Sequence, residues 1–99
     1  MRNWKLERLQ NGETFETSEK GNSMIPLIRS GQKHIIEPLK SWQDANVGDI
    51  VYCKIRSSFL THLVTAKNEI KGLQISNNHG HVNGWTKNAY GRVKEVLPL

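Results

Sequence analysis

The sequence predicts a single small domain built mostly from β-strands. Its 99 residues suffice for one modest hydrophobic core. Short runs rich in valine, isoleucine and threonine alternate with clusters of glycine, asparagine and serine, a pattern typical of strands joined by tight turns. No segment carries a convincing apolar stripe over three helical turns. We therefore expect one small, curled β-domain over residues 1–99.

The N-terminal segment, residues 1–20, is expected to form a hairpin. Trp4–Gln10 (WKLERLQ) alternates between bulky and charged side chains, as a half-buried strand does. Asn11 and Gly12 follow it, and this pair favours a type I′ turn, in which both central residues need a positive φ. Residues 13–17 (ETFET) would then return as the partner strand.

The rest of the chain continues as short strands and turns. Residues 39–47 lack a clear period, and we expect them to cross the surface with Trp42 as an anchor. Residues 77–85 (NNHGHVNGW) are crowded with turn formers, which predicts a polar loop. The expected strands are residues 33–37 (KHIIE), 50–56 (IVYCKIR), 59–66 (FLTHLVTA), 70–76 (IKGLQIS) and 89–97 (AYGRVKEVL).

The charge of the chain permits an acidic partner but does not specify one. Fourteen Lys and Arg against nine Asp and Glu give a net charge of +5, and the positive residues are scattered rather than clustered. Only weak, non-specific binding to nucleic acid is expected from this pattern. Trp42 and Trp85 could stack on bases, but each is isolated from basic clusters, so a role in anchoring a loop onto the core is favoured.

Composition also bears on compartment and on metals. Cys53 is the single cysteine, which excludes an internal disulfide and favours a reducing cytoplasm. The first ten residues lack the apolar core of a signal peptide, and no apolar run could span a membrane. His79 and His81, with His34, His62 and Cys53, invite a zinc interpretation, but no Cys or Asp pair completes a usual ligand set. We expect no metal and no cofactor.

Residues 21–28 (GNSMIPLI) contain the first candidate for chemistry. Gly21 and Pro26 predict a sharp turn, which can lift the Ser23 hydroxyl clear of the surface. A turn serine that bonds its own backbone is the alternative. A serine is a poor nucleophile near pH 7 and needs a neighbouring base to accept its proton. His62, in FLTHLV, could be that base, or it could be a histidine half-packed between Leu60 and Val64.

Three segments together resemble the superfamily of signal peptidase I and the LexA-like serine peptidases. GNSMIPLI is similar to its Ser-Met-x-Pro box, VGDIVYCKI to its Gly-Asp-x-Val strand, and YGRVKEV to its final Gly-x-Val strand. The resemblance covers roughly residues 21–96 and is nearest to small, soluble, often phage-associated members. It implies the curled β-fold of that superfamily, with Ser23 as nucleophile and His62 in the general-base position, which a lysine or a histidine occupies.

The resemblance leaves the orienting group for His62 open. Members with a histidine have a downstream Asp, whereas this chain has no carboxylate between Glu69 and Glu95. An asparagine can orient a histidine, so Asn77, Asn78 and Asn83 are the candidates. Backbone N–H groups at the Ser23 turn could stabilise an oxyanion.

Two functions are therefore expected in order of preference. The first is a serine-peptidase-like hydrolase that cleaves a peptide or ester bond through a Ser23–His62 dyad. The alternative is a catalytically inactive member of the fold that binds a protein or nucleic acid. The missing carboxylate fits either function.

Overall fold

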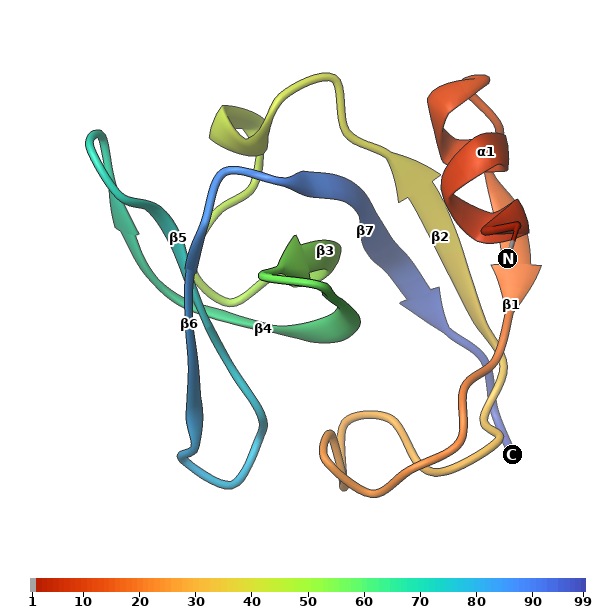
Figure 1. The fold of residues 1–99 in the computed structure, drawn as a ribbon. Coiled ribbons are helices and arrows are strands. Elements are labelled where there is room, and N and C mark those ends of the chain that lie inside the picture. The colour runs from red at the N-terminus through yellow and green to blue at the C-terminus, as the bar shows by residue number, and fades with distance from the viewer. Residues whose placement is uncertain (1) are drawn as a thin grey trace.

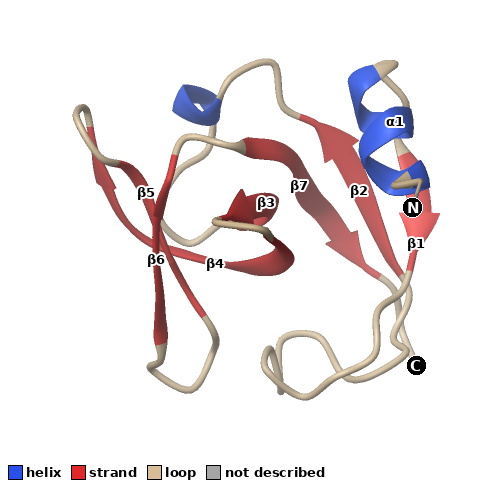
Figure 2. Cartoon of the chain, in the orientation of Figure 1, coloured by secondary structure: helices blue, strands red, loops and turns tan. Residues whose placement is uncertain are grey.

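The computed structural model describes residues 2–99, which form one seven-stranded antiparallel sheet and one short helix (Figures 1 and 2). The strands lie in the order β1-β2-β7-β3-β4-β5-β6. The expectation of a mostly β domain is confirmed. The elements are α1 (Trp4–Gln10), β1 (Phe15–Thr17), β2 (His34–Pro38), the 3-10 turn η1 (Trp42–Asp44), β3 (Ile50–Ile55), β4 (Ser58–Asn68), β5 (Gly72–Ser76), β6 (Val82–Thr86) and β7 (Ala89–Val96).

The central strands bury side chains on both faces of the sheet. Alternate residues of β3 enter different clusters. Val51 packs with Val64 and Ile75, whereas Tyr52 packs with Ile36 and with the partly buried Phe59. This explains the almost continuous apolar run IVYCKI, because a strand covered on both faces does not alternate with polar residues.

The sheet curls until its β6 edge approaches β3. The Thr86 hydroxyl, at the end of β6, donates to the Lys54 carbonyl of β3. A Cβ atom added to Gly84 would lie 3.6 Å from the Ile55 side chain. The curl brings segments far apart in the sequence to one place, which matters for the site described below.

The predicted N-terminal hairpin is wrong, because Trp4–Gln10 is an α-helix. Asn3 caps it through a side-chain bond to the Leu6 amide, and Leu9 is buried on its inner face. Asn11 has φ −82° and only Gly12 has a positive φ, of 82°, so the pair ends a helix and does not form a type I′ turn. The first strand, β1, pairs with β2 instead.

A second correction concerns residues 77–85, where the polar loop was expected. Its second half is strand β6, which pairs with β5 along Leu73–Thr86, Gln74–Trp85 and Ile75–Gly84. Asparagine and glycine hid this strand, because neither residue type favours β-structure. The five strands expected elsewhere are confirmed, with ends shifted by a few residues.

The segment between β2 and β3 follows the expectation for residues 39–47. It holds the turn η1, and Trp42 packs against the buried cluster around Val51 and Leu73. Across the residues that the structure describes, no helix is long and apolar enough to cross a membrane.

Cys53 should be unreactive in the native protein. Its side chain is fully buried in β3, and burial raises the pKa of the thiol to about 12. Since the thiolate is the reactive form, iodoacetamide at pH 8 should leave the folded protein unmodified and should alkylate it after denaturation. Mass spectrometry of both samples checks this, and alkylation of the folded protein at the denatured rate would contradict the burial.

Candidate functional site

Ser23 lies in the loop between β1 and β2, and the β5–β6 loop fixes the backbone around it. The Asn78 amide donates to the Ser23 carbonyl at 2.8 Å, and its side-chain Nδ2 donates to the Ile25 carbonyl at 3.1 Å. His79 Nε2 donates to the Asn22 carbonyl at 2.9 Å. Three hydrogen bonds thus hold the serine turn against a segment more than fifty residues away in the sequence.

The turn itself is anchored from beneath by apolar side chains. Met24 and Ile28 are both buried, and the Ile28 amide donates to the Met24 carbonyl at 3.0 Å. This hydrogen bond closes a single turn of the chain around Pro26. Ser23 is left half-exposed beside a pocket.

His62 approaches Ser23 from the middle of β4. Its side chain is 9% exposed, and Nε2 lies 3.0 Å from Ser23 Oγ. On the other side of the ring, Nδ1 lies 2.6 Å from Asn83 Oδ1. Because that amide oxygen can only accept, Nδ1 carries the hydrogen and Nε2 presents a lone pair to the serine hydroxyl. The imidazole is therefore held in the tautomer that a general base requires.

The three candidate asparagines occupy different places, and only Asn83 reaches His62. Asn83 lies in β6. Asn77 Oδ1 accepts from the amides of His79 and His81, so it shapes the loop. Asn78 bonds the serine turn, as described above.

The backbone of the serine turn offers donors for an anionic oxygen. In the part of the chain that the structure describes, the amides of Ser23 and Met24 donate to no backbone or side-chain acceptor. Backbone N–H groups next to a nucleophile are the usual donors to an oxyanion. The sequence expectation that the Ser23 amide could serve in this way is compatible with the geometry.

The histidines do not form a metal centre. His79 donates to the Asn22 carbonyl, and His34 is buried in β2. Both ring nitrogens of His62 are hydrogen-bonded, to Ser23 and to Asn83. Within residues 2–99, no group of three or more His, Cys, Asp or Glu side chains could hold a metal ion.

A pocket of about 270 Å³ opens beside Ser23 and His62. Its wall includes the side chains of Glu19 and Thr61, which no sequence pattern singled out, and of His34, which the sequence offered only as a possible metal ligand. They come from the β1–β2 loop, from β2 and from β4, and only the folded sheet brings them together.

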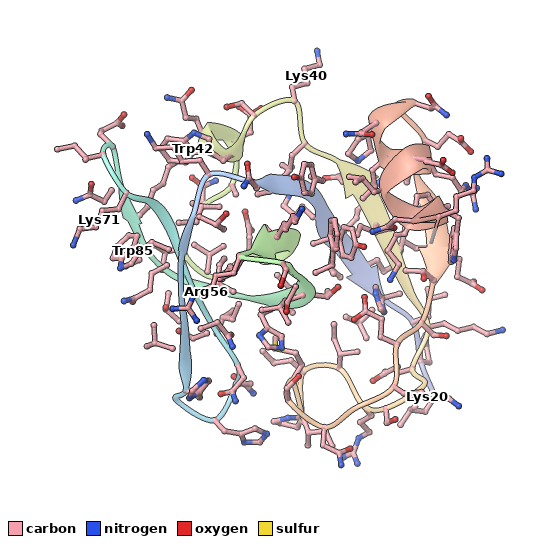
Figure 3. The ribbon with its side chains drawn as sticks, viewed as in Figure 1. Lys20, Lys40, Trp42, Arg56, Lys71 and Trp85 are labelled. Carbon is pink, nitrogen blue, oxygen red and sulfur yellow. The ribbon has the colours of Figure 1, made fainter. Side chains whose placement is uncertain are left out.

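The basic and aromatic residues of the surface do not gather into one interface. Lys71 Nζ lies 5.5 Å from the centre of the Trp85 ring and Lys87 Nζ lies 5.8 Å from the centre of the Trp42 ring, so each of these rings already has a cation over one face. In Figure 3, Lys20, Lys40 and Lys71 lie at separate edges of the molecule.

Comparison of the chain with known proteins adds no relative. No protein-family profile, no curated protein and no solved structure matches it. The chemistry of the site must therefore be argued from its own geometry.

Proposed function

We propose that the chain is a serine hydrolase that cleaves a peptide or ester bond. One observation carries the proposal: Ser23 Oγ, His62 Nε2, His62 Nδ1 and Asn83 Oδ1 form an unbroken hydrogen-bonded series with distances of 3.0 and 2.6 Å. A nucleophile bonded to a base, with the base oriented by a third group, is the arrangement that activates a hydroxyl. The three residues come from a loop and from two strands that are not neighbours in the sheet.

The reaction follows from these positions. Ser23 Oγ attacks the carbonyl carbon while His62 Nε2 takes the hydroxyl proton, and the carbonyl oxygen becomes an oxyanion next to the Ser23 amide. The bond to the leaving amine or alcohol then breaks, and His62 returns the proton to that group. Water, deprotonated by the same imidazole, hydrolyses the acyl–serine ester and restores the site. Asn83 is a positioning residue throughout.

We also infer that the chain is a divergent member of the signal peptidase I and LexA-like superfamily. The support is that Ser23, His62 and the Gly-x-Val segment of β7 occur in the chain order that the resemblance implies. The chain departs from the superfamily pattern at the group that orients the histidine, where members with a histidine have an Asp and this chain has Asn83. A neutral oxygen fixes the tautomer but stabilises the protonated imidazole less, so we expect slow turnover.

A serine-directed fluorophosphonate tests the hydrolase function directly. We expect wild-type protein to be labelled at Ser23 and the Ser23→Ala variant to remain unlabelled, because the probe traps only an activated hydroxyl. Peptide mass spectrometry locates the adduct, and Ser30→Ala, a serine in the same loop, is the matched control. If the wild-type protein resists the probe as fully as Ser23→Ala, the site is not catalytic and the chain is a binding module for a protein or nucleic acid.

A further inference from the structure

The pocket beside Ser23 combines an apolar lining with a small polar group. Met24, Ile28 and Phe59 contribute the apolar part, and His34, Glu19 and Thr61 the polar part. A volume of about 270 Å³ is near the lower end of small-molecule sites, which suits one side chain of a substrate rather than a cofactor.

His34 contributes a hydrogen-bond acceptor without a partner. Its side chain is 1% exposed, and Nδ1 lies 3.2 Å from the Gln32 carbonyl, so Nδ1 carries the hydrogen. Nε2 is buried and has no hydrogen-bond partner anywhere in residues 2–99. Burial also lowers the pKa of His34, which favours the neutral ring with a lone pair on Nε2. Such a buried group is costly unless something bonds to it.

Glu19 adds a second acceptor to the same wall. Burial raises the pKa of Glu19, but hydrogen bonds from Lys5 and Thr61 outweigh it, so the net pKa is lowered and the carboxylate is ionised. Both bonds end on Oε1, the one from Lys5 Nζ at 2.8 Å. No hydrogen bond from the described residues reaches Oε2, which leaves that oxygen able to accept.

The charges around the pocket determine which class of substrate side chain can donate a hydrogen bond there. Lys20 and Arg29 also line the pocket, and Lys5 already neutralises Glu19, so a cationic side chain would meet net positive charge. An anionic side chain brings only acceptors and cannot satisfy the His34 nitrogen. The remaining class is a neutral side chain that donates a hydrogen bond.

We propose that this pocket selects a substrate residue with a hydroxyl or carboxamide side chain next to the bond that Ser23 attacks. The hydrogen is donated to His34 Nε2, with Glu19 as a second acceptor, while the apolar lining contacts the carbon atoms. This inference rests on the hydrolase function proposed above. It adds the substrate class and the residue that reads it.

Isosteric peptide phosphonates test the selection. Acetylated diphenyl phosphonate analogues of threonine and valine have the same shape, and so nearly do those of asparagine and leucine. A site with an otherwise unpaired acceptor should react roughly tenfold or more faster with threonine than with valine, and with asparagine than with leucine. The lysine analogue should show no such advantage. Equal rates for threonine and valine in the wild-type protein would overturn the proposal.

Substitutions identify the residue responsible. His34→Leu should remove the preference for threonine, and His34→Gln should retain part of it, because the amide oxygen can still accept. His81→Leu, an exposed histidine outside the pocket, should change nothing. A preference that survives in folded His34→Leu protein, with folding checked by circular dichroism, would assign the selection elsewhere.

A binding measurement separates this inference from the hydrolase function. In Ser23→Ala protein labelled with ¹⁵N-histidine, acetyl-threonine methylamide should move the His34 Nε2 resonance, and acetyl-valine methylamide should not. If no phosphonate reacts but this shift occurs, the hydrolase function fails, and what stands is the preference of the pocket for a hydroxyl side chain. If phosphonates react without preference and neither compound shifts the resonance, the pocket proposal fails alone.

Discussion

Replacing His62 with alanine should slow fluorophosphonate labelling of Ser23 by about 100-fold or more, the range that general-base catalysis contributes. The reason is geometric, since among residues 2–99 Nε2 is the one side-chain acceptor at hydrogen-bond distance, 3.0 Å, from the serine hydroxyl. The wild-type labelling rate should rise with pH, because only the neutral ring can take a proton. Rates come from intact-protein mass spectrometry over a time course.

Two controls distinguish a base from a residue that merely supports the fold. His81→Ala removes an exposed histidine from a nearby loop and should leave the rate unchanged. Added imidazole should restore part of the labelling of His62→Ala, because it supplies the missing base, and the pH-dependent rise should disappear from the unrescued variant. An unchanged rate in His62→Ala would rule out the dyad.

The Asn83→Asp variant should be labelled about tenfold faster than the wild-type protein, or more. In the wild-type protein, Asn83 Oδ1 lies 2.6 Å from His62 Nδ1. A carboxylate at this position would keep that hydrogen bond and would also stabilise the protonated imidazole that forms during attack. Because a nearby negative charge favours the protonated ring, the rise of the labelling rate should move to higher pH. This shift marks a positioning role that a purely structural residue would not show.

Asn77→Asp is the matched control for the added charge. Asn77 lies in the β5–β6 loop, six residues before Asn83, and its Oδ1 accepts from two backbone amides, a task that an aspartate performs equally well. Its labelling rate should stay at the wild-type value. Asn83→Leu, which keeps the shape and removes the acceptor, should be labelled more slowly than wild type. If Asn83→Asp and Asn77→Asp behave alike, Asn83 does not orient the histidine.

The sequence predicted the part of the site that depends on local patterns. A serine between turn formers and a histidine within an apolar strand can be recognised from the sequence alone, and the structure brings Ser23 Oγ to 3.0 Å from His62 Nε2. The choice of Asn83 over Asn77 and Asn78 was not visible, because it depends on β6, a strand whose glycine and asparagine content favours turns. The polar wall of the pocket depends in the same way on contacts between distant segments.

The N-terminal error has a different origin. Asn11 and Gly12 are frequent both in hairpin turns and after the last residue of a helix, and the two structures differ only in the φ angle of the first residue. The apolar spacing of Leu6 and Leu9 and the cap at Asn3 favoured a helix, but one of only seven residues carries too short a pattern to decide. Packing decides it: Leu9 lies against Gly91 of β7, where any Cβ would meet the leucine methyl groups at 2.9–3.0 Å.

The hydrogen bonds between the β5–β6 loop and the serine turn determine when, during synthesis of the chain, the proposed hydrolase site can form. Ser23 is synthesised before Asn78 and His79, whose hydrogen bonds hold its turn, and before Asn83, which bonds His62; all three follow it by more than fifty positions. Closing so long a loop has an entropic cost that only the later strands offset. A nascent chain that stops before β6 contains Ser23 but lacks Asn83, the hydrogen-bond partner of His62. Under the proposed function, the hydroxyl would therefore be activated only when nearly the whole domain has been made and has folded.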